Sequence, residues 1–145
     1  MIFSANQLFS DDQAITATAL SENVIDLGDS GTPYDAAAAL HGDVGKGNPI
    51  PVLVQVTEDF ATLTSLTVSI ETGDASDLSD GTKLAEQTIV LADLTVGQQV
   101  AIQCLPNGLT GRYLGVRYTV TGTAATAGKI TAGITMGNQT NVTGA

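Results

Sequence analysis

A chain of 145 residues, 43% of them hydrophobic, is long enough to form one domain with a sizeable buried core. Its net charge of −10, from 15 acidic and five basic residues, argues against nucleic acid as a partner, because phosphate binding needs clustered Lys and Arg. No apolar run approaches the length of about 18 residues that a membrane span needs. Residues 1–12 lack the basic and apolar regions of a secretory signal. We therefore expect neither a nucleic acid nor a membrane partner.

The charge is distributed unevenly along the chain. Residues 1–93 contain all 15 acidic residues and two lysines, a net charge of −13, whereas residues 94–145 carry a net +3 from Arg112, Arg117 and Lys129. Chance and the needs of solubility account for such a distribution. The alternative is a molecule with oppositely charged poles that docks on a patterned surface.

Runs typical of β-strands follow one another along the chain, and helical periodicity is nearly absent. In most of these runs apolar side chains alternate with polar ones, which predicts strands with one face in the core. A connection rich in Gly, Asp and Pro extends from residue 28 to 49, and its run DAAAAL is too short to be more than a helical turn. The predicted strands are 13–19, 23–27, 51–58, 65–71, 83–91, 98–105, 112–121 and 129–136.

Eight short strands with one long connection predict an all-β, single-domain antiparallel β-sandwich, and they fit a jelly roll well. An immunoglobulin-type sandwich fits less well, since the chain has no Trp and a single Cys. We expect an N-terminal arm at 1–12, the jelly-roll domain at 13–136 and a polar tail at 137–145. The predicted core side chains come from the apolar faces of the strands: Leu66, Val68, Ile70, Leu114, Val116, Tyr118, Ile130 and Ile134.

Residues able to carry catalysis or hold a metal are few. His41, the one histidine, lies in a glycine-rich loop and is expected to be a surface residue, since a metal site of the cupin type needs several imidazoles. Asp74, Asp77 and Asp80 are spaced three apart, unlike the alternating carboxylates of a calcium loop, which predicts a solvated loop. Cys104 cannot form an internal disulfide and is expected to be buried in a strand.

No nucleophile and base stand in a recognisable catalytic arrangement. The 15 acidic residues leave many carboxylate pairs of the kind that glycosidases use, but sugar-active β-sandwiches usually present aromatic platforms, and this chain has three Phe, three Tyr and no Trp. We therefore expect no enzymatic activity, no catalytic residues, no metal and no cofactor.

One stretch carries a specific resemblance. Residues 8–28 read LFSDDQAITATALSENVIDLG, which resembles the N-terminal signature of a family of tailed-phage capsid cement (decoration) proteins, the Bordetella-phage type. GDVGKGNPIPVLVQVTEDF (42–60) resembles the family's lead into a core strand, and RYLGVRYTVTGTAATAGKITAGI (112–134) resembles its closing strand pair. Gly115 departs from the pattern, which commonly has a larger residue there, and the tail after Met136 is a second departure.

The resemblance implies a jelly-roll protein made in the host cytoplasm and carried on the outside of an icosahedral phage head. Such a protein bridges neighbouring major capsid protein subunits and holds the shell against DNA pressure. The resemblance also implies a homo-oligomer, a dimer before a trimer. Two alternatives stay open. A carbohydrate- or receptor-binding module of a head or tail fibre would need exposed aromatic residues or a metal site, and a bacterial adhesion subunit would need a secretion signal.

Seven residues are candidate contacts with the capsid or with a second copy. The arm contains more apolar bulk than a free terminus normally keeps, so it is predicted to pack against a neighbouring subunit or, as the alternative, to fold back over its own sandwich edge. Arg117 is predicted to point outward, because its position alternates with the core-facing Val116 and Tyr118. The candidates are Ile2, Phe3, Leu8, Phe9, Arg112, Arg117 and Lys129.

Overall fold

The computed structural model describes residues 3–40 and 49–137. All six strands of this part of the chain belong to one antiparallel sheet, with the order β1-β6-β4-β5, while the short strands β2 and β3 also pair with β6. The described part contains no α-helix, and thus no helix long and apolar enough to cross a membrane. The elements are β1 (Phe3–Ala14), β2 (Ala19–Leu20), β3 (Ile25–Asp26), β4 (Val52–Gly73), β5 (Thr82–Val90), the 3-10 turn η1 (Leu91–Asp93) and β6 (Tyr113–Thr135).

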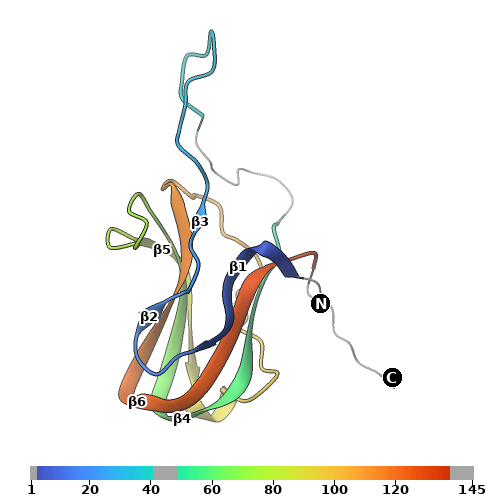
Figure 1. Ribbon diagram of the computed structural model, residues 1–145, viewed down its shortest axis with the longest axis vertical. Coiled ribbons are helices and arrows are strands. Elements are labelled where there is room, and N and C mark those ends of the chain that lie inside the picture. Colours follow the sequence, from blue (N-terminus) through green and yellow to red (C-terminus); the bar gives the residue numbers. More distant parts are fainter. Residues whose placement is uncertain (1–2, 41–48, 138–145) are drawn as a thin grey trace.

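The two long strands, β4 and β6, pair with each other along their whole length and bend together (Figure 1). Successive register shifts mark the bend between Val56 and Ser65 of β4. On the β6 side Gly128 has a φ of 134°, and a side chain there would meet the Phe60 ring at 2.2 Å. Such shifts turn a strand while much of its ladder continues. The sheet therefore folds over, and its two halves face each other.

The core lies between these two halves. It contains side chains from both halves of each long strand. Examples are Val54 and Val68 of β4, and Val116 and Ile130 of β6. Seven of the eight core residues predicted from the sequence are at most 1% exposed. The eighth, Ile134, is partly buried and packs against this cluster. The alternating pattern thus identified the inward face of each long strand.

The all-β antiparallel fold predicted from the sequence is confirmed, but the number of strands differs. The predicted strands 51–58 and 65–71 are one strand, β4, and the predicted strands 112–121 and 129–136 are one strand, β6. Between the second pair, Gly122 and Gly128 look like turn formers in the sequence. In the structure the residues that connect the predicted strands make the bend and keep partners across it, as Ala61 does with Ala127.

The predicted strand 98–105 is an irregular segment beside β4. It is joined to β4 by separate backbone hydrogen bonds, among them Val100 N–H to the Val54 carbonyl at 2.9 Å. Val100 and Leu105 are buried, whereas Cys104 between them is exposed, so the expectation of a buried cysteine was wrong. The alternation breaks because only isolated bridges, rather than a regular ladder, fix this segment.

The expected N-terminal arm is part of the sheet. Residues 3–12 lie in β1, which pairs antiparallel with the last third of β6. The described chain thus has the arrangement that was the alternative for this segment, folded back on its own sheet. Ile2, His41 and residues 138–145 of the expected tail lie outside the described residues.

Candidate interaction surface

In the part of the chain that the structure describes, the side chains able to hold a metal ion are not gathered in one place. Among residues 3–40 and 49–137, no three His, Cys, Asp or Glu side chains are grouped so that they could hold a metal ion. The Asp80 carboxylate accepts hydrogen bonds from the backbone N–H groups of Asp74 and Ala75 at 2.9 and 3.2 Å, which hold the pKa of Asp80 below its ordinary value. Asp77 accepts one from the Ser79 N–H at 3.0 Å. These bonds shape the loop between β4 and β5.

This loop, residues 74–81, folds over the outer face of the sheet. Leu78 is 2% exposed although it lies in a loop. Its side chain fills the space beside Gly115, where an added Cβ would lie 2.7 Å from the Leu78 Cδ1. Gly115 therefore makes room for a side chain of the loop between β4 and β5.

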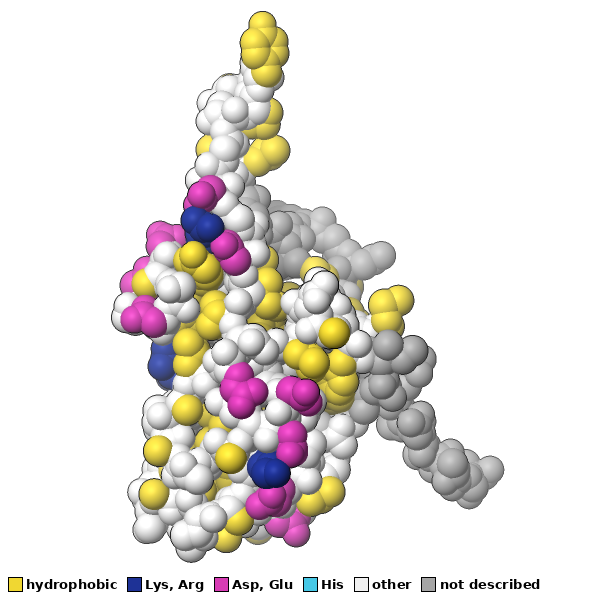
Figure 2. Space-filling model, viewed as in Figure 1, with side chains coloured by type: hydrophobic (Ala, Val, Ile, Leu, Met, Phe, Trp, Pro, Cys, Tyr) yellow, Lys and Arg dark blue, Asp and Glu magenta, His cyan; other side chains and the backbone are white. Residues whose placement is uncertain are grey.

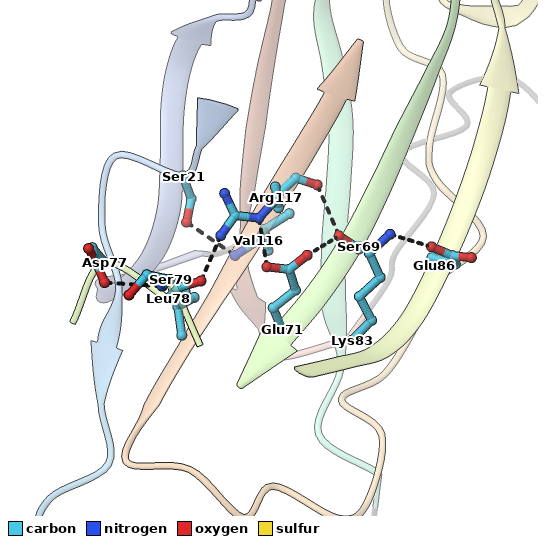
Figure 3. A network of polar contacts seen from close by, with 10 residues as sticks. All are labelled: Ser21, Ser69, Glu71, Asp77, Leu78, Ser79, Lys83, Glu86, Val116 and Arg117. Atoms are coloured by element: carbon cyan, nitrogen blue, oxygen red, sulfur yellow. Dashed lines mark hydrogen bonds and ion pairs between the residues drawn. The ribbon is translucent and has the colours of Figure 1, made fainter. Parts of the chain in front are cut away.

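Arg117 lies beneath the same loop, in a network of polar contacts (Figure 3). Its Nε donates to the Glu71 Oε2 at 2.7 Å, and its Nη2 donates to the Leu78 carbonyl at 2.9 Å. The Glu71 side chain is 4% exposed and also accepts a hydrogen bond from Ser69 at 2.9 Å. Arg117 thus alternates with the core side chains as predicted, but it stabilises a covered carboxylate instead of pointing freely outward.

Arg112 forms ion pairs at the base of the long connection between β3 and β4. Its Nε and Nη2 donate to the two carboxylate oxygens of Asp26, both at 2.8 Å, and its Nη1 donates to Asp29. The guanidinium also lies 5.2 Å from the ring centre of Tyr113. The hydrogen bonds from Arg112 hold the pKa of Asp26 at about 2.

Lys129 joins three strands. Its Nζ lies 2.9 Å from the Asp12 Oδ2 in β1 and 3.6 Å from the Glu58 Oε2 in β4. Lys83 pairs with Glu86 at 3.0 Å within β5. Every Lys and Arg of the described residues is thus paired with a carboxylate of the same chain. The positive end of the sequence and its acidic part meet in the fold, because β6 lies between strands that carry acidic residues.

The apolar residues at the N-terminus are used within the sheet. Phe9 is completely buried in the core, whereas Phe3 and Leu8 are partly buried. Phe3 and Leu8 cover Gly133 of β6, where an added Cβ would lie 3.0 Å from each side chain. β1 places all three by pairing with β6.

Polar residues of the stretch 8–28 form a buried cluster of hydrogen bonds. Ser10 Oγ donates to the Gln13 Oε1 at 2.6 Å and lies 2.8 Å from the Tyr118 hydroxyl. Gln13 donates to the Leu20 carbonyl at 2.9 Å and accepts from the Glu22 N–H at 3.1 Å. Burial raises the pKa of Tyr118 above its ordinary value. Ser10 and Gln13 therefore fix the turn after β1 to the core.

One segment with exposed apolar side chains was not among the predicted contact residues. Residues 28–40, here called the projecting loop, extend away from the sheet above β3 (Figure 1). All of them are exposed, including Tyr34 and Leu40. The sequence did contain a signal, because PYDAAAAL is an apolar run inside an otherwise Gly- and Asp-rich connection.

A small open pocket of about 240 Å³ lies at the base of the projecting loop. Its wall is mostly polar, and Arg112, which forms part of it, is already paired with Asp26 and Asp29. The pocket therefore offers no unpaired cation to an anionic ligand. Its lining residues are Gly28, Asp29, Ser30, Asp74, Thr110, Gly111 and Arg112.

The described residues thus form one antiparallel β sheet folded over on itself, whose basic side chains are paired within the chain and whose projecting loop carries exposed apolar side chains. The family model Bbp16 matches residues 9–134, which is most of the chain. The chain belongs to the Bbp16 family, a Bordetella phage protein family. No curated protein matches it.

Proposed function

We propose that this protein is a capsid cement (decoration) protein, which binds the outside of the phage head and stabilises contacts between major capsid protein subunits. The observation that carries the proposal is the membership of this chain in a phage protein family. In addition, every described Lys and Arg side chain is bonded to a carboxylate of the same chain. Ion pairs that join β6 to its neighbours suit a part that must stay folded under load. We propose no enzymatic activity, metal or cofactor for this protein.

Self-association belongs to the same proposal. A decoration protein that binds as an oligomer attaches at several points, which raises the total affinity without requiring large individual contacts. Two-fold symmetry is the commonest closed arrangement, so a dimer is proposed before a trimer.

The alternative of a carbohydrate- or receptor-binding fibre module has less support. Such a module would need several exposed aromatic rings to stack on sugars, and Tyr34 is the one aromatic among the large exposed hydrophobic residues of the described chain. The fibre module also predicts few copies per virion, whereas a cement protein is present in numbers comparable to those of the major capsid protein.

The copy number tests the proposal directly. Purified virions are separated into heads and tails, and this protein is quantified against the major capsid protein by mass spectrometry. We expect it in the head fraction at a near-stoichiometric ratio. Heads assembled without the protein should release DNA at a lower temperature, and adding the purified protein should restore the release temperature. A few copies per particle, found with the tails, would contradict the proposal.

A further inference from the structure

The projecting loop exposes side chains that a protein normally buries. Tyr34 is fully exposed and Leu40 is 67% exposed, and between them residues 36–39 are four exposed alanines. In Figure 2 hydrophobic side chains cover the end of the projecting segment, away from the body of the domain. Exposed apolar side chains concentrated on one projecting segment are typical of an interaction site.

The projecting loop is also built to hold one shape. The backbone groups of Gly31 and Leu40 exchange two hydrogen bonds at 2.8 and 3.3 Å, and the Ala36 N–H donates to the Pro33 carbonyl at 3.1 Å to close the turn at the tip. At the base, Arg112 holds Asp26 and Asp29. A preorganised loop loses less conformational entropy when it binds, so its exposed apolar side chains can contribute more of their burial to affinity.

The charges around the loop indicate which partner fits. Asp35 lies in the turn at the tip, whereas Asp29, near the base, is already paired with Arg112. A second copy of this chain would meet the Asp35 carboxylate with an acidic surface, because every Lys and Arg of its described residues is already paired. A partner with an apolar socket and basic residues around its rim complements both the side chains and the charge of the loop.

We infer that the projecting loop inserts into an apolar socket with a basic rim on a different virion protein, the major capsid protein. This inference rests on the proposed function and names the contact within it. Tyr34 is the central anchor, since an aromatic ring buried at the centre of an interface commonly dominates its binding energy. Asp35 contributes at the rim.

The first test is the Tyr34→Ala variant, measured for binding to heads assembled without this protein. We expect its affinity to fall about tenfold or more, as for an interface anchor, and Leu40→Ala should weaken binding in the same direction. The matched control is Val96→Ala, which removes a 61% exposed side chain near the bend of β4, where the Val96 N–H bonds to Asp59. The control should bind like the wild type. All three variants should keep the wild-type melting temperature, because these side chains are exposed.

The second test concerns the basic rim. Asp35 has a φ of 62°, which Asn also tolerates, so Asp35→Asn removes the charge and keeps the turn. We expect its affinity for heads to fall about two- to fivefold at about 0.1 M salt, and the difference from the wild type to close at about 1 M salt, where charge interactions are screened.

The outcomes separate the inference from the proposed function. If the wild type binds heads and Tyr34→Ala binds equally well, the loop is not the contact, while the proposed function stands. If Tyr34→Ala converts an oligomer to a monomer and leaves head binding unchanged, the partner of the loop is a second copy and the inference is wrong. If the wild type itself does not bind heads, the proposed function fails and the inference fails with it.

Discussion

At the scale of single residues, the basic side chains that sequence reasoning assigned to docking stabilise the fold. Arg117, Arg112 and Lys129 each bond a carboxylate that is distant in the sequence. The alternation of inward and outward side chains along the strand could place Arg117 on the face opposite the core. The same alternation could not show that a loop containing Leu78 covers that face. The partner of each cation could not be predicted because strand pairing and bend position decide it.

Removing Arg117 should destabilise the protein strongly. In Arg117→Ala the Glu71 carboxylate, 4% exposed, loses its charged partner, and we expect the free energy of unfolding to fall by about 3 kcal/mol. Urea denaturation measures the loss. The control is Lys83→Ala, whose ion pair with Glu86 lies in solvent and should contribute less than about 1 kcal/mol. Equal losses in the two variants would show that the covered pair has no special weight.

Asp26 should make stability depend on pH in acid. Its pKa is about 2 in the folded protein against an ordinary value of 3.8, so the folded state favours the carboxylate. The stabilisation is complete above pH 3.8 and is lost as the pH falls through about 2. We expect Asp26→Asn to lower the melting temperature at neutral pH and to converge with the wild type near pH 2. A constant difference between the two proteins at every pH would rule out this titration.

At the scale of strands and loops, the pattern predicted which residues face inward better than it predicted where strands end. Alternation identified the inward faces of β4 and β6, because burial of one face imposes a period of two. The bends were interpreted as breaks, since Gly122, Gly128 and the polar residues near them resemble ordinary turn formers. Only the tertiary fold shows that the two strands turn together. The apolar run in the projecting loop could be seen in the sequence, but its exposure could not.

The N-terminal segment should prove essential to the fold. Phe9 is fully buried between the halves of the sheet, and we expect Phe9→Ala to lower the free energy of unfolding by about 3–5 kcal/mol. Asn6→Ala, an exposed position of the same strand, should change it by no more than about 0.5 kcal/mol. Chemical denaturation compares the two. A small loss for Phe9→Ala would mean that β1 contributes little to the core, and deletion of residues 2–9 would then be a clean test of docking.

At the scale of the whole molecule, the separation of charge along the sequence does not survive folding. The cations of the last third lie on or beside β6, in the middle of the sheet, and they pair with acidic residues from β1, β3 and β4 and from the connection after β3. What remains on the surface is the excess of 15 acidic residues over five basic ones. Two copies of this chain therefore repel each other at long range, whereas a partner with a basic rim is attracted.

This difference predicts opposite effects of salt on the two proposed associations. The screening length falls from about 10 Å at about 0.1 M salt to about 3 Å at about 1 M salt. Screening removes the repulsion between copies that each carry −10, so the self-association constant measured by sedimentation velocity should rise with salt. It also weakens the attraction to a basic rim, so binding to heads should fall over the same range. Head binding that rises with salt as self-association does would show that the contact is purely apolar, because only an interface without complementary charge gains from screening of the acidic surface.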